Sequence, residues 1–479
     1  MTLKNSFFRF LAALLLAHLP MLALSDTEYI GVFLQDQRIG AIIATTRPTS
    51  DGRYSVVTTK FGARLLGQEA ILEVVSESWS DSTGRLTKQN VRMESAGRKS
   101  QIKALYGKDK ITVTRESEGE RFTKTIEVPQ DGSLVDDPVV TLLQKGKPEA
   151  RTKAVIYVLD PTMLSLVRNE VEWKGEKEIT FGGQERKALW LQIKDPRFTS
   201  DMFLDPKGEL IYATSVFGMQ LRPISREEAL GTNQYIPSID LATASSVRPD
   251  KPLIEPDKIL KLTLRLEGAD LPLLSSSSHQ TVKRDSNGIL LTIHPYYGSE
   301  KSAGTLATVK KEFTEYTRAE PQMPVNSPAI KKLAKQIIGK ETNAFKAALL
   351  INKYVHKIMK PNASIAVMRN AEEILKTKEG VCRDYAVLAA TLMRSIGIPA
   401  RLATGLVYWN DGFYYHMWVE AYTGTGWHAF DPTQGKERIS ATYIKLASGN
   451  PDKAMEVYTL DGVKITVLEQ VPAPKEVRR

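Results

Sequence analysis

The sequence has only one cysteine, Cys382, among 479 residues, so no disulfide can form within the chain. A lone cysteine is either a small apolar filler or a reactive thiol, and composition alone favours the filler. The chain also lacks the Cys-x-x-Cys and His-Glu-x-x-His patterns of zinc sites and the glycine-rich patterns that bind phosphates and dinucleotides. We therefore expect no catalytic metal and no organic cofactor.

The sequence shows no concentration of charge of one sign. The formal net charge is +10, but Lys and Arg are interleaved with Asp and Glu along the chain. Dispersed charge is typical of a solvated surface, so nucleic acid is not an expected partner. The apolar fraction of 42% and the length of 479 residues predict a globular protein with more than one domain.

Long hydrophobic runs are absent except at the N-terminus. There Lys4 and Arg9 precede an apolar stretch over residues 10–24, which His18 and Pro20 interrupt and which ends in small residues. This pattern predicts a secretory signal peptide over residues 1–25. A retained anchor is the alternative, although it would need about 20 uninterrupted apolar residues. We expect an exported protein, periplasmic or extracellular, with no stable membrane span after signal removal.

Residues 26–235 are predicted to form a β-rich N-terminal domain, an antiparallel sheet or half-barrel. Short β-branched segments alternate there with Gly, Asp, Asn and Pro. The clearest signal is the turn Asp205-Pro206-Lys207-Gly208 between segments 202–204 and 209–213, which predicts a hairpin. No catalytic residue is assigned in this region.

A small β domain with linkers is predicted over residues 236–326, and an α+β domain over 327–479. Prolines mark both boundaries, and the pattern becomes helical after Pro328. Apolar residues three and four positions apart predict helices over 329–338 and 344–358, the second capped by Asn343.

Cys382 stands where a further helix should begin. Residues 383–396 carry an apolar helical stripe that ends before Gly397 and Pro399. The unpaired N–H groups and the dipole of a helix N-terminus favour a thiolate, which is the nucleophilic form of cysteine. The same N–H groups can stabilise an oxyanion. This position favours the reactive thiol.

Two histidines and an aspartate follow in alternating segments, 413–422 and 427–431. If the turn between these segments closes between Thr423 and Gly424, His416 faces Asp431 across an antiparallel pair. A carboxylate in that place can hold the imidazole in one tautomer. His428 should point to the opposite face and is interpreted as structural. The remaining histidines of the mature chain, His279, His294 and His356, are expected in loops or on the surface.

Four motifs in this part of the chain resemble the transglutaminase-like superfamily of papain-related cysteine enzymes. They are Gly380-Val-Cys-Arg-Asp-Tyr-Ala, Arg394-Ser-Ile-Gly-Ile-Pro-Ala-Arg401, His416-Met-Trp-Val-Glu420 and Trp427-His-Ala-Phe-Asp-Pro432. The resemblance implies a papain-like fold with Cys382 as nucleophile, His416 as general base and acid, and Asp431 as orienter of the imidazole. It implies acyl transfer through a thioester.

The sequence departs from the animal cross-linking members of the superfamily that it resembles, because in those members a Trp follows the nucleophile. Here Arg383 follows Cys382, and no Trp lies between Leu191 and Tyr408. We therefore favour hydrolysis of protein, peptide or cell-wall peptide bonds. An acyltransferase and a non-catalytic envelope binding or scaffold protein remain the alternatives. The sequence predicts no oligomeric state.

Several neighbours of the three residues have both structural and functional interpretations. Asp384 matches the family motif but also suits the first turn of any helix, and Arg383 is read as a solvated neighbour. Glu420 is expected to form a structural ion pair, and Arg401 to brace the site or lie on the surface. Four aromatic residues are assigned either to a substrate cleft or to packing: Trp409, Tyr414, Tyr415 and Trp418.

Overall fold

The computed structural model describes two compact units. The N-terminal unit extends to Leu241, and the C-terminal unit comprises Ala242–Ala363 and Met368–Arg479. The residues that the structure describes are 27–65, 67–117, 119–135, 149–215, 218–231, 240–268, 271, 274–296, 300–365, 368–454, 460 and 462–473. The expected signal peptide lies outside them. Within these ranges no helix is both long enough and apolar enough to cross a membrane.

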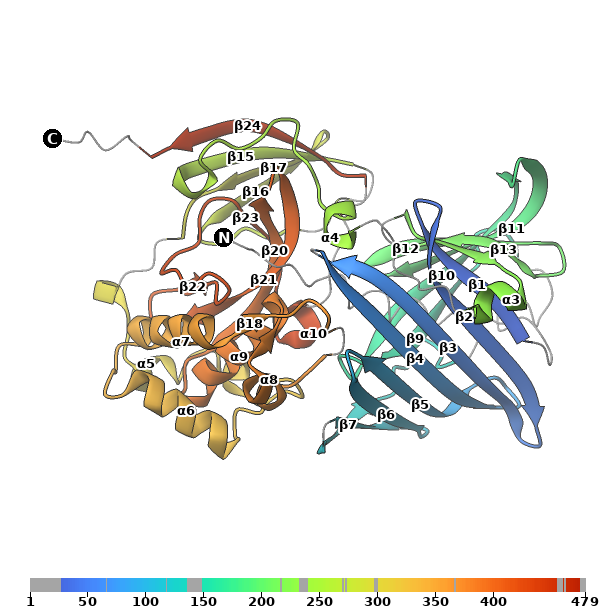
Figure 1. Cartoon of the computed structure of the whole chain (residues 1–479), viewed down its shortest axis with the longest axis horizontal. Coiled ribbons are helices and arrows are strands. Elements are labelled where there is room, and N and C mark those ends of the chain that lie inside the picture. Colours follow the sequence, from blue (N-terminus) through green and yellow to red (C-terminus); the bar gives the residue numbers. More distant parts are fainter. Residues whose placement is uncertain are drawn as a thin grey trace. The chain divides into compact units, whose positions relative to one another are not determined.

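The N-terminal unit is one antiparallel sheet of 14 strands, as predicted (Figure 1). Most strands pair with their neighbours in sequence, and β1 joins the two halves of the sheet by pairing with both β2 and β14, so that β8 and β9 are its edges. The strands are β1 Thr27–Leu34, β2 Gln37–Thr49, β3 Gly52–Leu65, β4 Gln68–Asp81, β5 Leu86–Ser95, β6 Arg98–Tyr106, β7 Lys110–Ser117, β8 Glu120–Glu127, β9 Lys153–Asp160, β10 Ser165–Phe181, β11 Gln184–Asp195, β12 Phe198–Leu204, β13 Leu210–Thr214 and β14 Gln220–Pro223.

The predicted hairpin at Asp205 is confirmed. β12 pairs with β13 in antiparallel register. The Asp205 carboxylate accepts hydrogen bonds from the backbone N–H groups of Lys207 at 2.8 Å and Glu209 at 2.9 Å, which is how aspartate stabilises a tight turn. A short helix, α3 Arg226–Leu230, follows β14.

The C-terminal unit contains a small four-stranded antiparallel sheet in the order β16-β17-β15-β24. Its strands are β15 Ile259–Glu267, β16 Gln280–Asp285, β17 Gly288–Ile293 and β24 Lys464–Pro472. Three of these strands lie in the segment predicted to be a small β domain. The fourth, β24, comes from beyond the predicted catalytic residues and pairs with β15.

A second four-stranded sheet of the C-terminal unit, β22-β21-β20-β23, packs against helices. Helix α9 contacts both β21 and β20, and α6, α7 and α8 pack around α9 (Figure 1). The elements are α6 Pro328–Ile338, α7 Ala344–Ile358, α8 Ala371–Thr377, α9 Cys382–Ser395, β20 Ala400–Trp409, β21 Gly412–Tyr422, β22 Trp427–Phe430 and β23 Tyr443–Gly449, with the shorter α4 Leu241–Ala244, α5 Leu306–Val309, α10 Pro451–Ala454, β18 Lys360–Pro361 and β19 Glu379–Gly380 and the 3-10 turns η2 Pro256–Lys258, η3 Glu300–Ser302 and η4 Thr314–Thr317.

Local signals that were read from the sequence hold in these elements. The Asn343 side chain accepts a hydrogen bond from the backbone N–H of Lys346 at 3.0 Å and caps α7 as predicted. Asn410 and Asp411, both with positive φ, make the tight turn between β20 and β21. The α+β C-terminal fold is therefore confirmed together with the β-rich N-terminal region.

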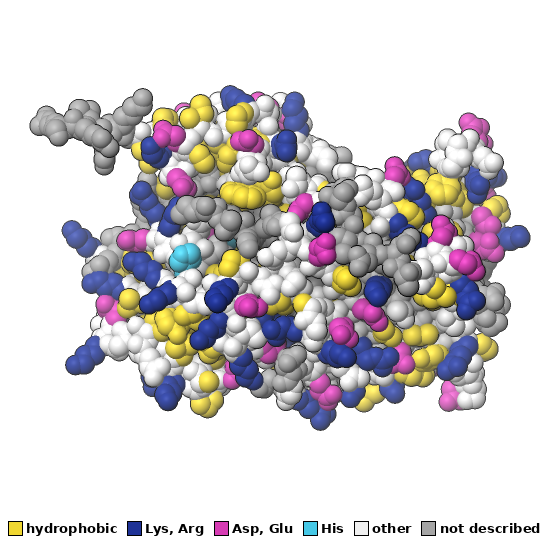
Figure 2. Space-filling view, in the orientation of Figure 1, with side chains coloured by type: hydrophobic (Ala, Val, Ile, Leu, Met, Phe, Trp, Pro, Cys, Tyr) yellow, Lys and Arg dark blue, Asp and Glu magenta, His cyan; other side chains and the backbone are white. Residues whose placement is uncertain are grey.

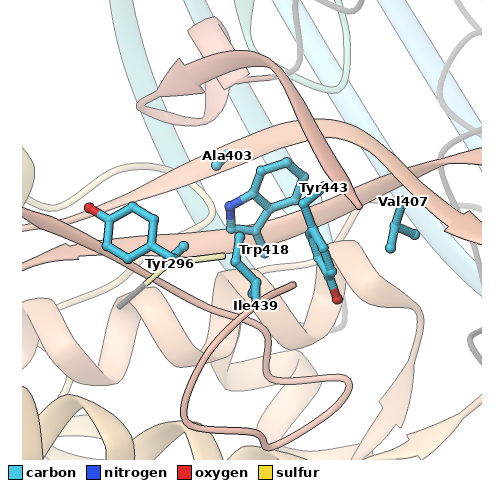
Figure 3. Packing of buried hydrophobic residues seen from close by; sticks show 7 residues of the cluster. Tyr296, Ala403, Val407, Trp418, Ile439 and Tyr443 are labelled. Atoms are coloured by element: carbon cyan, nitrogen blue, oxygen red, sulfur yellow. The ribbon is translucent and has the colours of Figure 1, made fainter. Parts of the chain in front are cut away.

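An aromatic cluster fills the core where this second sheet meets the loop that follows β22. Trp418 has no exposed surface, and the Tyr443 ring stands edge-on to it at a centroid distance of 5.4 Å (Figure 3). The cluster consists of Tyr296, Ala403, Val407, Trp418, Ala429, Ile439 and Tyr443. This packing fixes the face of β21 from which His416 projects.

Candidate active site

Cys382 is the first residue of α9, as the sequence predicts, and is 1% exposed. Val381 is the N-cap residue, and its backbone N–H donates to the Asp384 carboxylate at 3.0 Å. Gly380, at φ +154°, fits against the same carboxylate because a Cβ there would lie 2.6 Å from Asp384 Cβ and 2.7 Å from an Arg369 nitrogen. Glycine at 380 is therefore required for the chain to enter the helix at Cys382.

The helix start is braced by a buried ion network. Asp384 lies 3.3 Å from Arg369 and 3.4 Å from Arg383. Burial alone would raise the pKa of Asp384, but Arg369, Arg383 and the Val381 N–H hold it below its usual value. The expectation that Arg383 is solvated is wrong, since its side chain is 5% exposed. The Asp384 carboxylate thus acts structurally at the base of the helix that begins at Cys382.

The structure brings the His416 imidazole, on β21, to the Asp431 carboxylate. His416 Nε2 and Asp431 Oδ2 are 2.8 Å apart, and both residues are buried. Burial disfavours the imidazolium, but the Asp431 charge and then the Cys382 side chain outweigh it and raise the pKa of His416 to about 10. Cys382 lies close enough to the ring for its charge to favour the imidazolium. All three predicted residues therefore meet at one imidazole.

The strand register that was used to pair His416 with Asp431 is wrong by two residues. The observed partners are Val419 with Phe430 and Glu420 with Ala429, so the turn closes between Gly424 and Thr425. A shift of two keeps every side chain on its face. His416 and Asp431 are consequently diagonal neighbours beyond the end of β22, and their side chains still reach each other.

Two residues that complete the site were missed by the sequence reasoning. Tyr443, on β23, donates its hydroxyl to Asp431 Oδ2 at 2.7 Å, and Thr433 donates its N–H and hydroxyl to Asp431 Oδ1 at 2.8 and 2.7 Å. Burial would raise the pKa of Asp431, but His416, Thr433 and Tyr443 keep it low. The carboxylate is thereby held ionised and fixed in orientation. Thr433 could have been found from the Asp-x-Thr turn pattern.

A cleft of about 540 Å³ opens over Cys382. Tyr385, one turn further along α9, lines it together with Tyr408 and Trp409 from the end of β20 and His356 from α7. Of the four aromatic residues assigned to cleft or packing, only Trp409 lines this cleft. Tyr414, Tyr415 and Trp418 are buried at 3%, 3% and 0% exposure, so they pack.

Glu420 forms the structural ion pair that was expected. Its carboxylate accepts hydrogen bonds from Arg401 Nε at 2.8 Å and from Lys445 Nζ at 2.7 Å, and its side chain is 1% exposed. Arg401 also stacks over Trp427 at 4.0 Å. This network joins β20, β21 and β23. It lies next to His416, because Glu420 is on the same face of β21.

The other histidines divide by burial. His428 is buried, and its Nδ1 lies 2.5 Å from the Thr423 hydroxyl, so the structural interpretation fits. His294 and His356 are exposed, as expected. His279 contradicts the expectation of a surface residue: it is 2% exposed, and burial, followed by the nearby Lys445 charge, lowers its pKa to about 4.

The remaining sequence expectations concern metal ligands and surface charge. Among the described ranges, no group of three or more His, Cys, Asp or Glu side chains could hold a metal ion. On the face drawn in Figure 2, Lys and Arg side chains are distributed with Asp and Glu among them.

Residues 331–432 match the Transglutaminase-like superfamily, so the resemblance seen in the motifs is confirmed for this segment. Curated relatives include an uncharacterized protein of Mycobacterium leprae, 36% identical over 78 residues that cover 15% of this chain and 27% of the relative. The uncharacterized protein YebA of Bacillus subtilis is 27% identical over 152 residues, which cover 26% of this chain and 21% of the relative. The matches thus span about a quarter of these relatives.

Two solved structures resemble parts of the fold at low similarity. One, from Cytophaga hutchinsonii and named as a candidate cysteine protease, has a TM-score of 0.32 and 16% identity and covers 45% of this chain and 90% of its own. The other, a beta-barrel-like domain of unknown function from Brucella abortus, has a TM-score of 0.31 and 9% identity and covers 42% of this chain and 98% of its own.

Proposed function

We propose that this chain, whose residues 331–432 are transglutaminase-like, is an exported cysteine hydrolase that cleaves peptide or amide bonds through a thioester on Cys382. The observation that carries the proposal is the buried His416 imidazole, which the Asp431 carboxylate orients and which lies close enough to Cys382 for the charge of that side chain to act on it. The raised pKa of His416 favours an imidazolium beside a thiolate at neutral pH.

The acylation step follows from this charge state. The Cys382 thiolate attacks the carbonyl carbon of the substrate, and the oxygen becomes an oxyanion near the backbone N–H groups at the start of α9. The His416 imidazolium gives its proton to the amide nitrogen, which leaves as an amine. The product of this step is a thioester on Cys382 and a neutral imidazole.

Deacylation reverses the role of the imidazole. Neutral His416 takes a proton from water, which attacks the thioester carbonyl, and the Cys382 thiolate leaves as the free acid forms. Asp431 remains ionised throughout, because Thr433 and Tyr443 donate hydrogen bonds to it in addition to His416. Its role is to hold the ring and stabilise the imidazolium.

The cleft supports a peptide substrate, and the N-terminal sequence supports a location outside the cytoplasm. A space of about 540 Å³ beside Cys382, with Tyr385, Tyr408 and Trp409 in its walls, suits a peptide segment of a protein or of the cell wall. Residues 1–25 carry the basic, apolar and small-residue pattern of an export signal, which supports a periplasmic or extracellular enzyme.

Replacement of Cys382 by Ala is the direct test. We expect peptide hydrolysis to fall roughly 10⁴-fold or more, because removal of the nucleophile leaves only binding and oxyanion stabilisation. A native circular dichroism spectrum of Cys382→Ser controls for loss of the fold. In the wild-type protein, iodoacetamide labelling with peptide mapping measures the reactivity of the Cys382 thiol. A native protein whose Cys382 is inert at neutral pH would refute the hydrolase and favour the scaffold.

An acyltransferase would use the same thioester, so it is separated by its product. Hydrolysis yields the free acid whether or not a primary amine such as methylamine is present. If added amine converts the acid product to the amide at a faster rate than water does, the chain is a transamidating enzyme instead.

A further inference from the structure

A second cavity of about 760 Å³ lies beside the Cys382 cleft in the C-terminal unit. Four residues line both spaces: Asp257, Tyr408, Gln434 and Lys436. These four residues form a wall that the two hollows share, called the ridge below. The second cavity extends from the ridge along Lys353 of α7 and the 437–443 loop, and its wall includes Asp431 and Tyr443.

The ridge is anchored to the backbone of Asp431. The N–H groups of Gln434 and Gly435 donate to the Asp431 backbone oxygen at 3.1 and 2.9 Å. From α7, the Asn352 side chain donates to the Lys436 oxygen at 3.0 Å. The chain at 434–436 is therefore a fixed wall, and a bound molecule that crosses it passes directly beside the His416–Asp431 pair.

Cations predominate in the second cavity. Lys258, Lys353, Lys436 and Arg438 line it, against Asp257 and Glu437 once the Asp431 carboxylate is assigned to His416. Lys436 meets Asp257 at 3.3 Å, with 41% and 72% of the two side chains exposed. Such a pair is weak and easily exchanged. Lys353 makes no ion pair with any residue that the structure describes.

We propose that the second cavity is an anion-binding subsite of the substrate groove, in which Lys353 and Lys436 receive a carboxylate of the peptide whose amide bond lies at Cys382. The inference rests on the proposed function and adds a substrate class to it: peptides with an acidic group a few residues from the bond that is cleaved. On binding, the substrate carboxylate replaces Asp257 as the partner of Lys436.

Two kinds of peptide carboxylate fit this subsite equally well. One is an acidic side chain within the peptide, and the other is a free C-terminal carboxylate. Both give the same charge-assisted contacts with lysine ammonium groups. Peptides that differ only in Glu against Gln, or only in a free against an amidated end, separate the two sources.

Binding of fluorescein-labelled peptides to the full-length Cys382→Ser protein tests the subsite without any turnover. The probes are an amidated hexapeptide of Glu, its Gln counterpart, and the Gln peptide with a free C-terminal carboxylate, each followed by fluorescence anisotropy. We expect at least one carboxylate peptide to bind about tenfold more tightly than the amidated Gln peptide, with the preference decreasing as salt is added. The carboxylate peptide that binds more tightly shows whether the subsite takes a side-chain or a C-terminal carboxylate.

The double variant Lys353→Gln/Lys436→Gln should reduce this preference to within twofold. Lys357→Gln is the matched control, because Lys357 is an exposed lysine of the same helix that lines neither cavity. Equal binding of all three peptides, or a preference that survives the double variant, overturns the subsite. Iodoacetamide labelling of Cys382 in the wild-type protein reads the proposed function separately, so an inert thiol with intact peptide preference refutes the enzyme alone.

Discussion

The two units place their charged side chains differently. In the N-terminal sheet, ion pairs such as Lys103–Glu116, 3.4 Å apart, lie on the strands with 48% and 38% of their side chains exposed. In the C-terminal unit, Glu420 is 1% exposed between Arg401 and Lys445, and His416–Asp431 is buried completely. Burying a charge is costly unless it is paired, so the C-terminal unit maintains its networks at a cost that the N-terminal sheet largely avoids.

One cluster in the N-terminal unit qualifies this difference. Arg197 is buried between Asp195, 2.6 Å away, and Asp160, 3.2 Å away. Asp195 also accepts the Arg197 N–H at 2.9 Å, so the cluster shapes the turn between β11 and β12. Buried charge by itself therefore marks structure as readily as chemistry. The C-terminal network is distinguished by the thiol of Cys382 and a cleft next to it.

Among the variants that test this difference between the units, Asp431→Asn should have the largest effect. Loss of the carboxylate leaves the imidazole without its orienting charge, and we expect kcat to fall roughly 10²- to 10⁴-fold. Because Asp431 helps to raise the pKa of His416 to about 10, the wild-type rate should fall on the alkaline side only as pH approaches 10, where the imidazolium is lost. In the variant that limb should move to lower pH.

Profiles of kcat/KM against pH for the two proteins check this. Tyr443→Phe, which removes one hydrogen bond and keeps the carboxylate, is the milder control. An alkaline limb at the same pH in wild type and Asp431→Asn would contradict the assigned coupling.

A smaller effect is expected for stability, and it compares the units directly. Glu420→Gln leaves the ammonium of Lys445 buried without its counter-charge, which should cost about 3 kcal/mol in the free energy of unfolding. Glu116→Gln removes an exposed partner in the N-terminal sheet and should cost less than about 1 kcal/mol. Urea titrations followed by intrinsic fluorescence measure both. Equal losses would remove the distinction between the two kinds of ion pair.

The smallest effect is a pH dependence from His279. Its folded pKa of about 4 is below the unfolded value of about 6.5, so its contribution is fully present above pH 6.5 and is lost as pH falls towards 4. Between pH 7.5 and 5 this loss amounts to about 2 kcal/mol. His279→Gln should flatten the dependence by that amount in urea titrations, whereas His294→Gln, an exposed control, should leave it unchanged.

Helices and caps with a short-period pattern could be predicted from the sequence, whereas the register between paired strands could not. The hydrophobic spacing after Pro328, the Asn343 cap and the helix that begins at Cys382 are local properties, and the structure has them. The register of β21 and β22 depends on where a Thr-Gly-Thr-Gly turn closes, and each of its glycines permits another closure. The predicted face for His416 survived because the error was an even number of residues.

The parts that stayed hidden depend on contacts across long stretches of chain. Tyr443 reaches Asp431 only after an irregular loop of 12 residues, over which no periodicity carries a face assignment. His279 has a polar serine run before it, but Lys445, Tyr296 and the sheet behind them enclose it. Burial of this kind is a property of the assembled unit and has no local signal.

The pairing of β24 with β15 has a consequence for how the chain is made. The small sheet joins residues 259–267 to residues 464–472, and everything from Gly268 to Val463 lies between them in sequence. Until the ribosome has released that last strand, β15 has one unpaired edge that can recruit other chains. We therefore expect truncations before Lys464 to aggregate, because β15 would keep that edge unpaired.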